Sequence, residues 1–379
     1  MKLYHIIGLS TASLLSLGAL GLMAQTEATP YNTDFRLETL SGNVTALNGI
    51  QLENITKTGP NQFSKVIITG ENASLTPTKY DTFHGVGEDV LENRELYRHL
   101  TWPETLENDN YLITANFNYS YLYTNTEPVL RIRSKNKDTG QINIQEVSLD
   151  QLLYGENIMT EFLTENNGKY YYIAKVYDQR GNKNDRILTY EIDPTTLKLS
   201  LKYEEELSEW SSMYVHNGVI YRNPNESNHL MITTLETNET KTYKMNGVDE
   251  YVYIENITTV NNELFFLIDS VIMKASFNDD NQEINLTPTQ TPSFIESSTN
   301  EFESIYPQSL TENNDLVYTM YESYNTNSSK QYLSVLDPST DKIIYEGKIM
   351  IRPDQGLVNN YQLKTVNQDY SISFPPPLT

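Results

Sequence analysis

Short apolar runs, each preceded by one or two Asn, Asp or Gly residues, recur along this chain. The segment Asn217-Gly218-Val219-Ile220-Tyr221 shows the pattern clearly. Turn residues before β-branched and aromatic residues predict a strand that begins just after the turn. The predicted strand starts are Ile50, Tyr111, Tyr170, Val219, Leu264, Leu316 and Tyr370. Their spacings are 61, 59, 49, 45, 52 and 54 residues, and such a period in a strand-rich chain predicts a repeat architecture.

A second recurring element follows each strand start by about 25 residues and predicts a hairpin. Its clearest copies are Tyr190–Leu199, which contains Asp193-Pro194-Thr195-Thr196, and Leu333–Ile343, which contains Asp337-Pro338-Ser339-Thr340. The Asp carboxylate can cap the turn, and Pro fixes φ at the next position. Each unit is therefore expected to hold an inner strand that begins at the Asn or Gly signal, a second strand, a tight turn and an outer strand.

Units of this size and content predict an all-β fold, a β-propeller. Six intervals indicate six blades, with a strand near Tyr370 pairing back onto the first blade; seven blades remain open if the N-terminal segment holds one more. Closure removes free sheet edges. The Asp-Pro-x-Thr turns resemble those of bacterial extracytoplasmic propellers with YVTN and quinoprotein-like repeats. The resemblance covers residues 108–345 and implies the fold alone, and the Trp-docking motif of quinoprotein blades is missing.

The propeller domain is expected over residues 35–379, after a linker at 25–34. Residues 35–40 alternate apolar and polar side chains, as a half-buried strand does. Residues 76–107 break the repeat and are expected to form an insert. Within it, a short helix is predicted from Glu88 to Leu100, because acidic residues come early and basic ones late. Insertions on a rigid scaffold often carry function.

The first 24 residues predict export. Lys2 precedes an uncharged stretch from Ile6 to Ala24, as in a secretory signal peptide. The stretch is also long enough to span a bilayer, so a cleaved signal and an uncleaved membrane anchor both remain open. Either one predicts an extracytoplasmic protein, secreted or held at the cell membrane.

Composition narrows the function classes. Asp plus Glu number 50 against 27 Lys plus Arg, a net charge of −23, which disfavours a nucleic-acid partner. The chain has no Cys, which excludes disulfides and thiolate chemistry. It carries none of the common hydrolase, zinc-protease or phosphate-loop motifs. Its five His residues show no helical metal-ligand spacing. No metal site and no cofactor are predicted.

The insert holds the one unusual cluster of chemically capable side chains. An exposed Trp beside polar groups would suit sugar stacking or a partner contact. The alternative is that Trp102-Pro103 fixes the insert to the propeller body, and this alternative is favoured. The candidate binding residues are His84, Glu88, Asp89, His99, Trp102 and Glu104.

Tyr-rich segments at 119–123, 170–172 and 251–253 are expected to pack between sheets and not to form a binding surface. The leading hypothesis is a non-catalytic binding or sensing module of the cell envelope, whose partner is a membrane or envelope protein. The first alternative is an extracellular enzyme acting on a glycan or small substrate at the mouth of the propeller channel. The second is a structural surface protein that self-associates.

Overall fold

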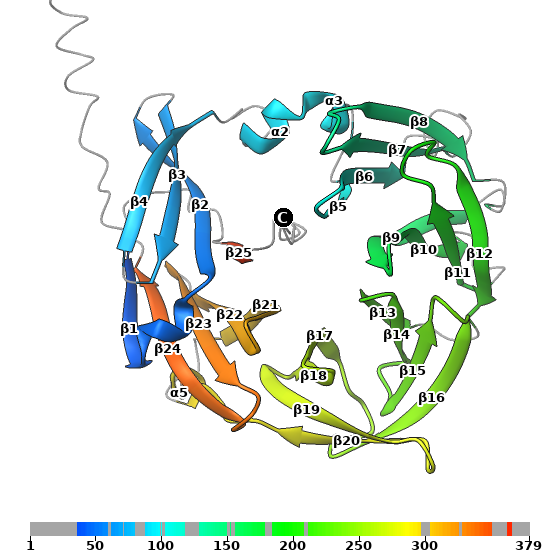
Figure 1. The fold of residues 1–379 in the computed structure, drawn as a ribbon. Helices are drawn as coiled ribbons and strands as arrows, with labels where there is room; N and C mark the ends of the chain where they lie inside the picture. The colour runs from blue at the N-terminus through cyan, green and yellow to red at the C-terminus, as the bar shows by residue number, and fades with distance from the viewer. Residues whose placement is uncertain are drawn as a thin grey trace, which may run out of the picture.

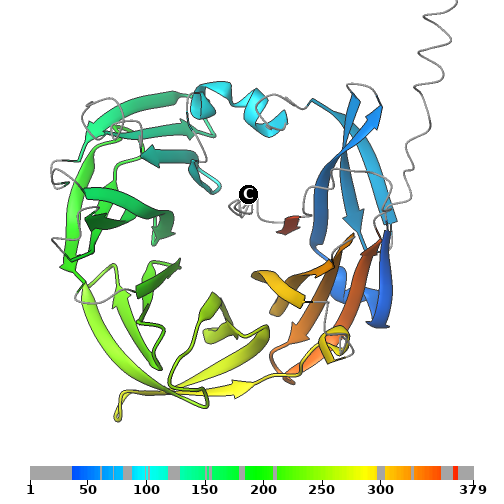
Figure 2. The same cartoon turned by 180° about the vertical axis from the view of Figure 1, so that it is seen from behind.

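The protein is all-β, with a few short helices, and its sheets stand in a propeller-like ring around a central axis (Figure 1; seen from behind in Figure 2). The structure is a computed structural model. It describes residues 36–59, 62–70, 72–79, 88–98, 100, 103–117, 129–149, 152, 156–178, 184–207, 211–296, 304–325, 328–350 and 362–365.

Three sheets have four antiparallel strands each. From the inner to the outer edge, the first contains β25 (Gln362–Thr365), β2 (Ile50–Gly59), β3 (Gln62–Thr69) and β4 (Asn72–Thr78). The second contains β5 (Glu104–Glu107), β6 (Tyr111–Phe117), β7 (Val129–Asn136) and β8 (Ile142–Ser148). The third contains β9 (Glu156–Asn166), β10 (Lys169–Asp178), β11 (Arg186–Ile192) and β12 (Leu199–Glu206).

The next sheet has eight strands and is built from two antiparallel units of four. One unit contains β13 (Ser211–His216), β14 (Val219–Pro224), β15 (His229–Thr234) and β16 (Glu239–Asn246). The other contains β17 (Ile254–Val260), β18 (Glu263–Ile268), β19 (Val271–Asn278) and β20 (Glu283–Pro288). Their outer strands join by a short parallel pairing of 244–246 with 283–285.

The last sheet has five strands, because the first strand of the described chain joins its outer edge. Its strands are β21 (Ser304–Asn313), β22 (Leu316–Asn325), β23 (Ser328–Asp337), β24 (Lys342–Met350) and β1 (Arg36–Gly42). The short helices are η1 (Val44–Leu47), α2 (Glu88–Glu92), α3 (Arg94–Tyr97) and α5 (Ser293–Glu296).

The strand starts predicted from the Asn/Gly signal are confirmed to within one residue for β2, β6, β10, β14, β18 and β22. The expectation that these strands are innermost is wrong, because each is second from the axis. The second strands are buried on both faces, as β10 shows with seven consecutive buried residues. A strand covered on both faces reads as a continuous apolar run. The inner strand is more polar and gives no such signal.

The Asp-Pro turns lead into the fourth strand of two sheets, where the sequence predicts a turn before an outer strand, but the strand before each turn is the third and not the second. The Asp193 carboxylate accepts hydrogen bonds from the Thr195 amide at 2.9 Å and the Thr196 hydroxyl at 2.7 Å. These bonds stabilise the charged carboxylate and lower the pKa of Asp193 to about 2. Asp337 caps the equivalent turn by accepting from the Ser339 amide at 2.9 Å.

Two strands from the ends of the described chain close the ring. A C-terminal strand does pair with the first sheet, but it is β25, and the predicted strand near Tyr370 lies outside the described residues. In addition, β1 pairs with β24 on the last sheet, a second closure that the sequence pattern did not reveal. One core cluster joins both sheets, in which Leu52 and Ile68 of the first pack with Tyr318 and Val335 of the last.

The connection from β4 to β5 contains the predicted helical segment, as α2 and α3. The expected insert of residues 76–107 includes the end of β4 and all of β5. In Figure 1 the two helices lie between β4 and β8. Leu96 of α3 is fully buried, and its carbonyl accepts from the Thr114 hydroxyl at 3.0 Å. Arg133 of β7 donates to the Glu95 carbonyl at 2.9 Å. The described part of the insert therefore fills the space beside the second sheet.

No helix in the described part of the chain is long and apolar enough to cross a membrane. The expected signal peptide or membrane anchor at residues 1–24 and the linker at 25–34 lie outside the described residues.

The turn between the first and second strands of one unit can contact the same turn of the neighbouring unit. A Gly→Ala substitution is therefore expected to lower stability by different amounts at two equivalent glycines. Gly168 and Gly218 both have positive φ, at 75° and 71°. A Cβ at 168 would meet no atom within 4 Å, whereas one at 218 would lie 2.4 Å from the Asn166 Cβ. We expect Gly168→Ala to lower the free energy of unfolding by about 1 kcal/mol through backbone strain. Gly218→Ala should cost roughly 1–3 kcal/mol more through overpacking. Urea denaturation of both variants checks this; equal losses would contradict the turn-to-turn contact.

Candidate functional site

The six candidate residues of the insert are placed unevenly. His84, His99 and Trp102 lie outside the described residues. Glu88 and Asp89 begin α2, and their side chains are likewise outside the description. Glu104 begins β5, the inner strand of the second sheet. Of the predicted set, the structure therefore supplies side-chain detail for Glu104.

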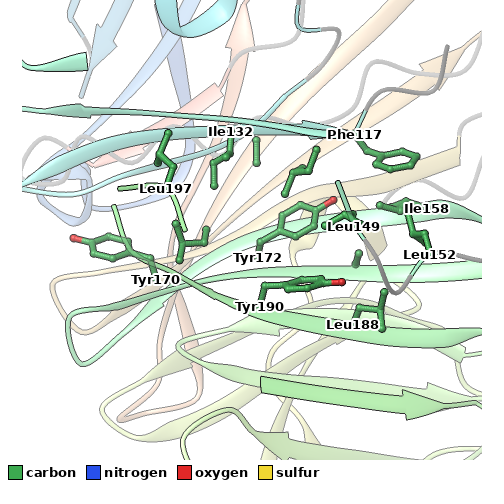
Figure 3. Packing of buried hydrophobic residues seen from close by; sticks show 14 of the residues in the cluster. Phe117, Ile132, Leu149, Leu152, Ile158, Tyr170, Tyr172, Leu188, Tyr190 and Leu197 are labelled. Carbon is green, nitrogen blue, oxygen red and sulfur yellow. The ribbon is translucent and has the colours of Figure 1, made fainter. Parts of the chain in front are cut away.

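Glu104 faces a second carboxylate, that of Glu161 on β9. Glu104 lies opposite Ala115 on β6, and Glu161 lies opposite Ala174 on β10. Residues opposite each other in an antiparallel pair point to the same face of their sheet. Both alanines belong to the apolar cluster that fills the space between these two sheets (Figure 3). The two carboxylates therefore approach each other at the inner edge of this cluster.

Donors from both sheets hold Glu161 in place. The Phe117 amide donates to its two oxygens at 3.1 and 3.3 Å, and the Tyr172 hydroxyl donates at 2.8 Å. Phe117 and Tyr172 are both fully buried and are labelled in Figure 3. Hydrogen bonds from two donors stabilise the negative charge on Glu161. The side chain is thus held in one position, where it bridges the second and third sheets.

The environment of Glu104 favours its neutral form. Burial is the larger cause and the charge of Glu161 the smaller, and together they raise the pKa of Glu104 from 4.5 to about 7. Both side chains remain partly accessible to solvent. Near neutral pH the pair therefore presents a carboxylic acid that can donate a proton beside a carboxylate that can accept one.

Two further layers continue this interface toward the turn. Leu106 and Leu163 lie two residues beyond the carboxylates on the same faces and pack against the same cluster. Beyond them, the side-chain amide of Asn108 donates to the Glu165 carboxylate at 2.6 Å and to the Tyr170 hydroxyl at 2.8 Å. Hydrogen bonds at the turn and apolar packing next to it therefore hold the second and third sheets together. The backbone positions of Glu104 and Glu161 are fixed by these contacts.

Glu161 was not among the residues predicted from the sequence. Ala115 and Ala174 each stand four residues after a Tyr at the start of their strands, Tyr111 and Tyr170. The glutamates that pair with these alanines do not align in sequence, because Glu104 lies seven residues before Tyr111 and Glu161 lies nine residues before Tyr170. Their equivalence therefore needs the strand register and the strand order within each sheet, and the sequence pattern assigned that order wrongly.

The tyrosine segments divide into two kinds. Tyr170, Tyr171 and Tyr172 are buried, which confirms that they pack between sheets. Residues 119–123 lie outside the described residues. Tyr251 and Tyr253 differ from the expectation, because they are 77% and 50% exposed. They precede β17 in a connection that runs outside the packed sheet faces.

The described residues contain no group of three or more His, Asp or Glu side chains that could hold a metal ion. Of the described histidines, His216 at the end of β13 forms a hydrogen bond of 2.8 Å between its Nε2 and the Thr259 hydroxyl, and burial lowers its pKa. This pairing connects two neighbouring units and suits a structural role.

Comparison with known proteins identifies no family. No family model and no curated protein matches the chain. Among solved structures, the chain is similar to YjhT at 10% identity and a TM-score of 0.40, covering 82% of this chain and 98% of that one. It is similar to the periplasmic gluconolactonase PpgL of Pseudomonas aeruginosa at 8% identity and 0.41, covering 78% and 81%. It is also similar to TolB from Acinetobacter baumannii at 11% and 0.38, covering 82% and 65%. Likeness at this level carries no conclusion about function.

The raised pKa of Glu104 predicts how stability depends on pH. The folded state binds the Glu104 proton more tightly than the unfolded state does. The contribution of Glu104 to the free energy of unfolding is therefore fully present below pH 4.5 and is lost as the pH rises through about 7. This shift in the pKa of Glu104 corresponds to at most about 3 kcal/mol in the free energy of unfolding. Solvent screening of the partly accessible carboxylates makes the contribution smaller. We expect Glu104→Gln to be more stable than wild type at pH 8 and about equal to it at pH 4.

Urea denaturation at both pH values, with Glu239→Gln as an exposed control on β16, measures this difference. A Glu104→Gln variant with the same pH dependence as wild type would show that the pKa of Glu104 is not raised in the folded state.

Proposed function

We propose that this protein is an exported binding protein of the cell envelope, built on a six-bladed propeller. The blade count follows if the two antiparallel halves of the eight-stranded sheet each count as one blade, because each has the four-strand order of its neighbours. Export follows from the uncharged segment Ile6–Ala24. Whether this segment is cleaved or anchors the protein, the propeller would work outside the cytoplasm, beside a membrane or envelope partner.

The observation that carries the binding proposal is the pairing of Glu104 with Glu161 at the inner edge of two sheets. A neutral carboxylic acid donates a hydrogen bond, and a fixed carboxylate accepts one. Adjacent hydroxyl groups of a sugar offer both partners at once. The proposed ligand is therefore a neutral glycan or another polyhydroxylated molecule, bound at this edge.

A second candidate function is hydrolysis of such a glycan, and the raised pKa of Glu104 favours it specifically. Glycoside hydrolysis needs one carboxylic acid that protonates the leaving oxygen and one carboxylate that activates water or stabilises the sugar cation. Glu104 would be the acid and Glu161 the carboxylate. The two candidates share a ligand class and differ in whether Glu104 transfers its proton to the ligand.

Binding is tested by calorimetry with a panel of neutral oligosaccharides, including cellotetraose and chitotetraose. We expect Glu104→Ala to weaken binding about tenfold or more, as loss of a hydrogen bond to a charged or acidic group does. Glu107→Ala is the matched control, because Glu107 lies on the same strand and pairs with Lys137. The binding proposal fails if the panel shows no binding, or if both variants bind like wild type.

Turnover is tested by incubating the same oligosaccharides and detecting reducing ends. Glu104→Gln keeps a hydrogen-bond donor but cannot release a proton, so an enzyme should lose at least 100-fold in rate while still binding. If wild type binds without releasing reducing ends, hydrolysis is excluded for these ligands and the binding function stands.

A further inference from the structure

Tyr251 and Tyr253 form an exposed aromatic surface in the connection between β16 and β17. Their side chains are 77% and 50% exposed, while Val252 between them is 3% exposed and packs in the core. The alternation shows that this segment is extended, with one residue facing inward and two facing solvent. Most large apolar and aromatic side chains of the described chain are buried, so two adjacent exposed tyrosines need an explanation.

Backbone hydrogen bonds hold this segment rigidly against the turn after β14. The Asn228 amide donates to the Glu250 carbonyl at 2.9 Å, and the Val252 amide donates to the Glu226 carbonyl at 2.5 Å. Ser227 and Tyr251 form an isolated antiparallel bridge. The tyrosines are therefore presented in fixed positions before any partner arrives, which lowers the entropic cost of binding.

The charged residues nearest the two tyrosines along the chain and on the paired turn are acidic, and the exposed Lys244 lies beyond them, opposite His229. Asp249 and Glu250 are exposed next to them, and Glu226 lies on the turn that the segment pairs with. No Lys or Arg occurs from residue 245 to 255 or from 223 to 228. The wider field is also negative, since the chain carries a net charge of −23. A ligand that approaches this surface therefore meets aromatic faces bordered by carboxylates.

We infer that Tyr251 and Tyr253, with Glu226, Asp249 and Glu250, form a docking surface for a cationic segment of a partner protein, rich in Arg or Lys. Guanidinium and ammonium groups bind aromatic faces through cation–π attraction and bind flanking carboxylates through ion pairs. Charge complementarity favours this partner over a neutral one, because carboxylates bordering the aromatic faces attract a cationic segment at long range and a neutral ligand would gain only hydrogen bonds from them. The inference does not depend on the carboxylate pair of β5 and β9.

The test uses a fluorescein-labelled peptide of alternating Arg and Gly residues and measures its fluorescence anisotropy with the full chain. Replacing both tyrosines (Tyr251→Ala, Tyr253→Ala) should weaken binding about tenfold without changing the charge of the protein, as two exposed cation–π contacts would. Ile144→Ala is the control, because Ile144 is 57% exposed on β8 of another sheet. This control should bind the peptide like wild type.

A double change of Asp249→Asn and Glu250→Gln should also weaken binding and reduce its dependence on salt. The inference is overturned if the tyrosine variant binds the peptide as tightly as wild type, because attraction would then come from the general negative field. It is equally overturned if the tyrosine variant loses affinity for a neutral oligosaccharide and not for the peptide. Unchanged thermal unfolding of each variant ensures that the loss is local.

Discussion

Every sheet in this protein depends on having a neighbour on both faces, and a ring is the arrangement that provides one to each. The second strands, such as β10, are buried on both sides. A fully buried aliphatic or aromatic side chain contributes about 1.5–3 kcal/mol relative to an exposed one. In an open row of sheets, the first and last would each expose an apolar face. Closing the ring buries these two apolar faces against each other. The cluster that contains Leu52 and Ile68 of the first sheet and Tyr318 and Val335 of the last forms this contact.

The closure uses chain segments from opposite ends of the described sequence. β25 completes the first sheet at its inner edge, and β1 extends the last sheet at its outer edge. These pairings join residues at the greatest sequence separation among the described strands. Losing β25 or β1 would leave the pairing edge of β2 or β24 exposed, so the two strands tie the ends of the described chain to the ring.

The same geometry explains where chemistry can occur. The second and third strands pack against neighbouring sheets on both faces. The inner strand has one unpaired edge toward the axis and accommodates polar residues. Glu104 and Glu161 lie on such strands, and the donors on Phe117 and Tyr172 hold Glu161 in place. The surface at Tyr251 and Tyr253 arises differently, from a connection that leaves the packed faces. The ring thus presents two candidate sites of different chemistry on separate elements.

The sequence by itself determined the repeat, the strand starts and the turn chemistry. These features are local: an Asn-Gly turn before Val219, or an Asp193 carboxylate that accepts from the next residues, needs no distant partner. The sequence also indicated a helix in the connection before Glu104. Only the tertiary structure decided which strand lies innermost, how the ring closes, that Glu161 faces Glu104, and that Tyr251 is exposed while Tyr171 is buried. Those outcomes depend on which sheet faces which, and contacts between residues 50 or more apart leave no mark on local periodicity.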